Sequence, residues 1–164
     1  MRFTKRNTIS RNKNLQIDQT YKQKSGFKPN GLWYSYYSSW YKWILENELY
    51  VRLYKYIHHI GIANKSLTNI YEQDYNKILV IKNTTDFDIF HNKYKIKMKT
   101  YDCINWKKVS IDYGGIEFVP YLLERRKIDW YYTFDIAGGC IWNNKIIKEI
   151  KLIYEKVGDN YIKV

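Results

Sequence analysis

The hydrophobic and polar positions of this 164-residue chain follow two periods, which predict short strands mixed with short helices. Apolar and polar residues alternate over residues 14–21, so a strand is expected there. Residues 32–35 and 50–57 are rich in aromatic and β-branched side chains, which favour strands. The continuously apolar run of residues 77–82 is typical of a strand buried on both faces.

Apolar residues spaced three and four positions apart predict three helices, over residues 38–48, 84–94 and 104–113. Serine or threonine stands at the start of the first two, where a side-chain oxygen can cap the first turn. Trp40 and Trp43 would share one face of the first helix. That spacing fits a packed core better than a surface for stacking bases.

The last third of the chain predicts strands over residues 116–121, 130–136 and 140–142, and a helix, or a helix plus a strand, over residues 146–157. The mixed order of elements indicates an α+β fold. We expect a single compact domain over residues 1–164, with mixed or antiparallel sheets and three or four short helices.

The charge of the chain is strongly positive, with 28 basic and 16 acidic residues and a net charge of +12. Eight basic residues and one acidic residue lie within residues 1–30, and residues 1–13 are a candidate flexible basic arm. This excess predicts attraction to polyanions such as nucleic acid, although a lysine-rich soluble surface is the plainer alternative. The candidate nucleic-acid contacts are Arg2, Lys5, Arg6, Arg11 and Lys13.

Several classes of protein are disfavoured by what the sequence lacks. There is no P-loop, no dinucleotide-binding glycine motif, no nucleophile elbow and no HExxH motif. Two cysteines and three histidines without ligand spacing predict no metal site and an intracellular, cytoplasmic setting. No apolar run approaches the length of a membrane span, so no membrane partner is expected. The oligomeric state stays open.

Two carboxylates are candidates for chemistry, because each lies among apolar residues of an expected strand. Glu117 in GGIEFVPY would pair with a cation, line a cavity or face solvent. Asp135, in WYYTFDIAGGCIW, would either bind a donor on a neighbouring strand or take part in a site.

The chain resembles an uncharacterised family of giant-virus, phage and microbial proteins over roughly residues 26–143. The shared blocks are the KPNGLWYS stretch from Lys28, the GGIEFVPY stretch around Glu117, and the run from Trp130 to Trp142. This resemblance implies a host-cell or virion location and gives no activity.

GLWYS, at residues 31–35, followed by a serine-rich helix start, also resembles the nicotinamide-holding strand of ADP-ribosyltransferases. The resemblance implies that the chain binds NAD and transfers ADP-ribose to a protein or nucleic acid, with Glu117 as the catalytic carboxylate. Gly115 stands where that family has glutamate or glutamine, and the expected first strand lacks the family's His or Arg. The cofactor-binding residues it implies are Lys28, Gly31, Tyr34, Ser35, Tyr37 and Trp40.

Two further functions stay open beside the transferase. The chain would act as a non-catalytic binder of nucleic acid through its basic N-terminal region and its tyrosines. Alternatively, it would be a virion-associated structural protein whose aromatic residues only pack.

Overall fold

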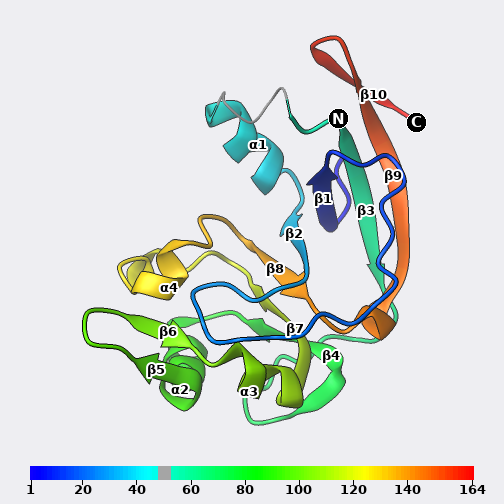
Figure 1. Ribbon diagram of the computed structural model, residues 1–164. Coiled ribbons are helices and arrows are strands. Elements are labelled where there is room, and N and C mark those ends of the chain that lie inside the picture. The colour runs from blue at the N-terminus through cyan, green and yellow to red at the C-terminus, as the bar shows by residue number, and fades with distance from the viewer. Residues whose placement is uncertain (48–52) are drawn as a thin grey trace.

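The computed structural model describes residues 1–47 and 53–164, and its central element is a mixed sheet of eight strands. The strand order is β10-β9-β3-β1-β2-β8-β7-β4; β4 and β7 are parallel, and the other described pairs of this sheet are antiparallel (Figure 1). The strands are β1 (Arg6–Ser10), β2 (Leu32–Tyr36), β3 (Tyr56–Ile62), β4 (Asp74–Ile81), β7 (Tyr113–Phe118), β8 (Gly138–Ile141), β9 (Ile147–Val157) and β10 (Asn160–Lys163).

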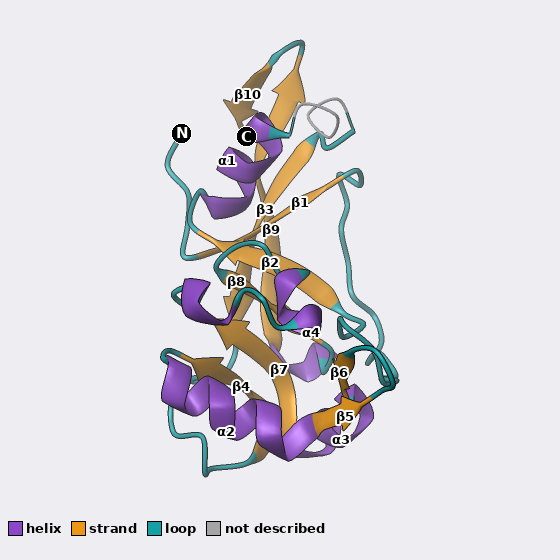
Figure 2. Cartoon of the chain, turned by 90° about the vertical axis from the view of Figure 1, so that its left-hand side faces the viewer, coloured by secondary structure: helices purple, strands orange, loops and turns teal. Residues whose placement is uncertain are grey.

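Within the described residues, four α-helices complete the single compact α+β domain that the sequence predicts. Figure 2 shows α2 and α3 beside β4 and β7 at one end of the sheet, and α1 at the other end. A small hairpin, β5 (Lys95–Lys97) with β6 (Asp102–Ile104), lies near α2 and α3. The helices are α1 (Ser39–Glu46), α2 (Thr84–Tyr94), α3 (Trp106–Asp112) and α4 (Asp129–Tyr132), with 3₁₀ turns at Leu123–Arg125 and Asn144–Ile146.

The largest core lies where β4, β7 and β8 meet α2, α3 and α4, and it is mostly aromatic. Phe87 of α2 stacks on Trp130 of α4 with ring centroids 5.3 Å apart, and Trp106 meets Trp130 edge to face at 5.9 Å. Phe118 of β7 closes the cluster and is fully buried. Burying a phenylalanine of this kind contributes about 1.5–3 kcal/mol, so this core anchors that end of the sheet.

The helix predictions are confirmed for residues 84–94 and 104–113, which contain α2 and α3. Both helices are capped by an asparagine: Asn83 accepts from the backbone N–H of Asp86, and Asn105 accepts from that of Lys108. The expected helix at 38–48 is α1, and residue 48 lies outside the described residues. Trp40 N–H donates to the Ser35 hydroxyl at 3.2 Å, whereas Ser38, at the cap position, makes no side-chain cap bond.

The strand predictions for residues 32–35 and 77–82 are confirmed by β2 and β4. The expected strand at 116–121 overlaps β7, and that at 140–142 overlaps β8. For the strand expected at 50–57, residues 50–52 lie outside the described residues, and β3 begins at Tyr56.

Two strand predictions are wrong: residues 14–21 form no strand, and residues 130–136 begin with the short helix α4. For residues 146–157, where a helix or a helix plus a strand was expected, the α-helix is wrong: residues 147–157 form the long strand β9. Apolar residues recur in 146–157 without a clear period, and pairing with β3 and β10 decides the outcome.

The N-terminal region is ordered where a flexible basic arm was expected. Residues 6–10 form β1, which pairs with β3 on one side and β2 on the other. A hydrophobic pattern does not predict this strand, because most of its residues are polar. Arg6, Asn7 and Thr8 are nevertheless all buried. Arg6 forms an ion pair with Glu117, and the Asn7 amide donates to the carbonyls of Thr4 and Tyr37.

Candidate ligand-binding site

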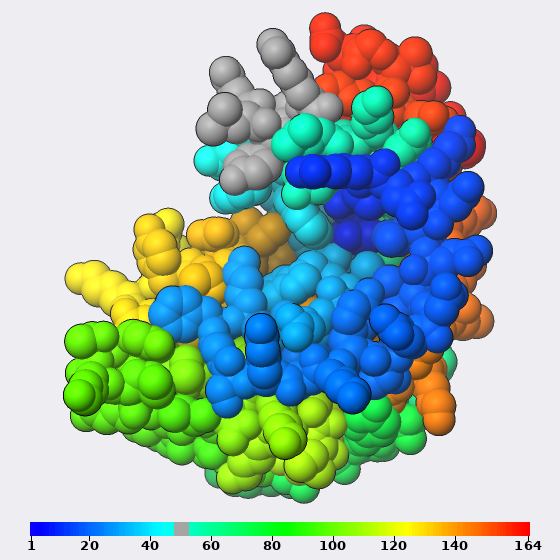
Figure 3. All heavy atoms as spheres, viewed as in Figure 1, coloured from blue at the N-terminus to red at the C-terminus, as the bar shows by residue number. Residues whose placement is uncertain are grey.

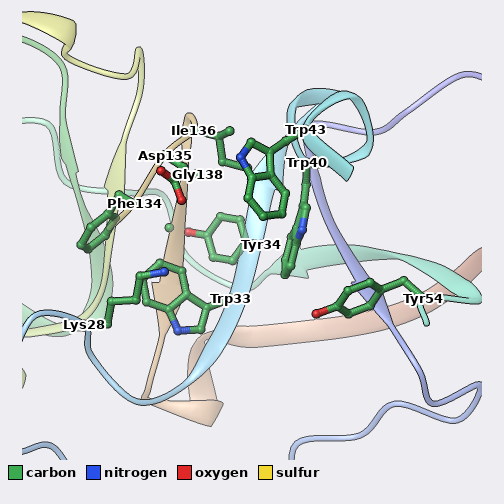
Figure 4. Close-up of a pocket in the computed structure, with 11 residues that line it drawn as sticks. Lys28, Trp33, Tyr34, Trp40, Trp43, Tyr54, Phe134, Asp135, Ile136 and Gly138 are labelled. Carbon is green, nitrogen blue, oxygen red and sulfur yellow. The ribbon is translucent and has the colours of Figure 1, made fainter. Parts of the chain in front are cut away.

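A cavity of about 350 Å³ opens between α1, β2 and the turn that precedes β8. We call it the aromatic pocket. Figure 3 shows the surface hollowed between α1 and the segment that follows α4, and Figure 4 shows the side chains that converge there. Six aromatic residues line it together with Lys28, Asp135, Ile136, Gly138 and Gly139: Trp33, Tyr34, Trp40, Trp43, Tyr54 and Phe134.

Strand β2 supplies one wall of the pocket, and a glycine allows the chain to enter that strand. At Gly31 an added Cβ would lie 2.3 Å from the carbonyl oxygen of Ile141, so only glycine permits this approach to β8. Trp33 then packs edge to face on Phe134, with ring centroids 5.2 Å apart. The ring of Tyr34 reaches the pocket, although only 2% of this residue is exposed.

Behind Tyr34 lies a buried polar cluster centred on Glu117 of β7. The Glu117 carboxylate accepts hydrogen bonds from Arg6 Nε at 2.5 Å, Tyr34 Oη at 2.6 Å and Tyr36 Oη at 2.6 Å. Glu117 is fully buried, and Arg6 is 7% exposed. The carboxylate is therefore neutralised by one cation and held by three donors, which is the arrangement that a buried charge requires.

The cluster shifts the pKa values of Tyr34, Tyr36 and Arg6. Burial raises the pKa of both tyrosines, and the negative charge of Glu117 raises them further. For Arg6, burial lowers the pKa, but the hydrogen bond and charge of Glu117 outweigh burial and hold the pKa above its ordinary value. Arg6 therefore stays a cation, and both tyrosines stay neutral hydrogen-bond donors.

Gly139 of β8 lies between Tyr34 and Glu117 in the register of the sheet. A Cβ at this position would lie 2.8 Å from Tyr34 Oη, 2.8 Å from Glu117 Cγ and 2.3 Å from the carbonyl oxygen of Ile116. The missing side chain leaves the space in which the hydrogen bond crosses β8. Gly139 therefore serves this internal contact.

One end of the pocket is charged. Lys28 Nζ lies 5.1 Å from the centroid of the Trp33 ring, and Figure 4 shows the Asp135 carboxylate facing the same end. Surrounding protein lowers the pKa of Lys28, and the nearby charge of Asp135 acts in the opposite direction. Within residues 1–47 and 53–164, the Asp135 carboxylate has neither a hydrogen-bond partner nor an ion pair, so it is available to a ligand.

The structure brings together three of the six cofactor-binding residues expected from the sequence. Lys28, Tyr34 and Trp40 line the pocket, whereas Gly31, Ser35 and Tyr37 do not. Glu117 does not line it either, because Tyr34 and Gly139 stand between its carboxylate and the cavity. The sequence did not predict that Trp33, Trp43, Tyr54, Phe134 and Ile136 line the pocket. For Asp135 it left open a structural role and a part in a site.

The five candidate nucleic-acid residues divide by exposure. Arg6 is buried and forms an ion pair with Glu117, whereas the other four residues are exposed: Arg2, Lys5, Arg11 and Lys13. Lys13 Nζ forms an ion pair with Glu155 at 2.7 Å. The guanidinium of Arg11 lies 5.6 Å from the ring centroid of Tyr54, which lines the pocket, so one basic residue of this group borders the site.

Comparison with known proteins gives no relative: no protein-family model, no curated protein and no solved structure matches the chain. Among the described residues, no helix is long and apolar enough to cross a membrane, and no three His, Cys, Asp or Glu side chains are grouped as metal ligands. The pocket itself is therefore the basis for a functional proposal.

Proposed function

We propose that the chain binds a nucleotide, either free or at the end of a single strand, with its base among the aromatic residues of the pocket. The observation that carries the proposal is the convergence of Trp33, Trp40 and Trp43 on one cavity beside Lys28. Its volume of about 350 Å³ falls within the range of roughly 300–1,000 Å³ typical of small-molecule sites. Aromatic side chains that stack on bases are the usual means of holding nucleotides without a phosphate-binding loop.

Charge favours a nucleotide over a neutral aromatic ligand. The ammonium of Lys28 lies over the Trp33 ring at the pocket, and Arg11 lies over Tyr54 at its border. The net charge of +12 attracts anions toward the protein over longer distances at low ionic strength. A phosphate on the ligand would thus meet positive charge at either end of the pocket.

The geometry supports binding better than ADP-ribosyl transfer. Transfer needs a carboxylate that reaches the nicotinamide ribose as positive charge develops there. Glu117 is fully buried, and its two oxygens accept from Arg6, Tyr34 and Tyr36. NAD is therefore treated as one of the nucleotides whose binding can be tested.

Quenching of tryptophan fluorescence tests the proposal, because three of the six tryptophans line the pocket. The panel is AMP, GMP, NAD and a 5′-phosphorylated deoxyadenosine oligonucleotide, titrated at low ionic strength. We expect saturable quenching, and Trp40→Ala should weaken binding by about 1–3 kcal/mol, the usual contribution of a stacked base. Tyr71→Ala, at an exposed aromatic residue outside the pocket, should leave the affinity unchanged.

Comparison of the oligonucleotide with AMP distinguishes the end of a single strand from a free nucleotide as the ligand. Stronger binding of the oligonucleotide than of AMP would identify a single strand as the ligand, and the reverse would identify a free nucleotide. If no member of the panel quenches the fluorescence at millimolar concentration, the proposal is wrong. Consumption of NAD by the wild-type protein would instead support the transferase.

A further inference from the structure

Asp135 occupies a strained turn at the charged end of the pocket. Its φ of +61° lies in the left-handed region, and Tyr37 is the other non-glycine residue with positive φ among the described residues. The N–H of Ile136 donates to the carbonyl of Phe134 at 2.7 Å, which closes a three-residue turn around Asp135. A bond of this span with positive φ at its centre marks the rarer, strained form of γ-turn.

The packing of the Asp135 side chain does not account for this strained backbone. The residue is exposed, and its carboxylate makes no hydrogen bond or ion pair to the part of the chain that the structure describes. Phe134 packs on Trp33, so the turn places a free carboxylate beside aromatic rings. Strained backbone of this kind gathers at binding and catalytic sites, where it presents a side chain.

An ionised carboxylate only accepts hydrogen bonds, so the ligand must offer donors at this end of the pocket. Among the common bases, guanine alone presents two adjacent donors on its Watson–Crick edge, N1–H and the N2 amino group. Adenine and cytosine each place one amino group next to a ring-nitrogen acceptor, and uracil places its N–H between two carbonyl oxygens. Two parallel hydrogen bonds to a carboxylate therefore select guanine.

We infer that Asp135 makes the aromatic pocket selective for guanine nucleotides. The inference rests on the proposed nucleotide binding and specifies its base. The base then lies between the indoles, with its donor edge toward the γ-turn.

Fluorescence titrations with GMP, AMP, CMP and UMP test the inference on the wild-type protein. GMP should bind about tenfold more tightly than the other three. In Asp135→Asn the affinity for GMP should fall about tenfold and that for UMP should stay within about twofold, since asparagine tolerates left-handed backbone but turns a donor toward the base. Asp18→Asn, at an exposed aspartate outside the pocket, controls for the change in net charge.

A ligand-side test needs no variant and so does not depend on the folding of Asp135→Asn. A methyl group on N1 of GMP removes one of the two donors, and 1-methyl-GMP should bind the wild-type protein about tenfold more weakly than GMP. Equal affinity for the four nucleotides, or for GMP and 1-methyl-GMP, would overturn the selectivity and leave nucleotide binding standing. Absence of quenching by all of them would overturn both.

Discussion

The hydroxyl of Tyr34 on β2 donates a hydrogen bond of 2.6 Å to Glu117 on β7, across the intervening strand β8. The same tyrosine lines the aromatic pocket, whereas Glu117 lies behind it and binds Arg6 of β1. One buried carboxylate thus joins three strands and fixes the position of a pocket residue. Glu117, which the resemblance to ADP-ribosyltransferases implies as the catalytic carboxylate, thus holds the strands of the fold together.

Glu117→Gln should strongly destabilise the protein, because it keeps the shape of the side chain but leaves the buried Arg6 cation unpaired. Removing one partner of a buried ion pair costs about 3–5 kcal/mol. We expect a loss of that size in urea unfolding, with a fall in melting temperature of about 10 °C.

The matched control for this change is Glu155→Gln, which breaks the ion pair with Lys13 on the surface. The Lys13 side chain is 51% exposed, so its pair with Glu155 should contribute less than about 1 kcal/mol. Equal stability of the two variants would show that the buried hydrogen bonds of Glu117 do not stabilise the fold.

Gly139→Ala should destabilise the protein by a different route. The new methyl group would approach the Ile116 carbonyl oxygen, which belongs to the backbone and cannot move aside, and it would press on both Tyr34 and Glu117. Overpacking of this kind costs about 1–3 kcal/mol or more. The measurement is urea unfolding beside Gly26→Ala, where no atom lies within 4 Å of an added Cβ. If both alanine variants are equally stable, β8 has more freedom than the structure shows.

Elements whose burial follows a continuous apolar run or a helical period could be predicted from the sequence. The run from Ile78 to Ile81 is buried throughout and forms the inner part of β4, and α2 buries Phe87, Phe90 and Tyr94 as their spacing predicts. Strand β1 could not be predicted, because its buried residues are polar and are satisfied by partners far along the chain. Arg6 meets Glu117 111 positions later, and no local pattern encodes such a pairing.

Only part of the candidate site could be predicted, because some of its residues come together only through strand pairing. Lys28, Tyr34 and Trp40 come from one segment whose mixture of glycine, proline and aromatic residues is visible in the sequence. Phe134 and Asp135 reach the pocket only because β8 pairs with β2. The position of Asp135 among apolar residues marks it as a candidate, but a pattern of hydrophobicity cannot show its left-handed backbone.

His91 should make the protein less stable in acid. Trp130 Nε1 donates to His91 Nδ1 at 3.0 Å, so this nitrogen must be unprotonated in the folded protein. Burial lowers the pKa of His91, and Lys95 lowers it further against the opposite effects of Asp102 and Asp88. Below the unfolded value of about 6.5 the unfolded chain binds more protons, so the free energy of unfolding falls as the pH falls.

Urea unfolding at pH 7.5 and 5.5 measures this effect. His91→Asn keeps an acceptor near Trp130 but does not titrate, and it should lose less stability between the two pH values than the wild-type protein. The remaining dependence includes His58, whose pKa is also lowered by burial. Identical slopes for the variant and the wild type, or an NMR titration of His91 above pH 6.5, would contradict the prediction.

Lys28→Gln should weaken nucleotide binding and reduce its dependence on salt. Each phosphate contact with a cation releases a counterion, so the slope of log K against log salt should become shallower by about 0.7 for a single-stranded ligand. Titration of the 5′-phosphorylated oligonucleotide between low and moderate ionic strength measures the slope. Lys108→Gln is the matched control, since Lys108 also lies over an aromatic ring, 5.8 Å from the Tyr94 centroid, but outside the pocket. An equal change of slope in both variants would mean that the phosphate senses the overall charge of the protein rather than Lys28.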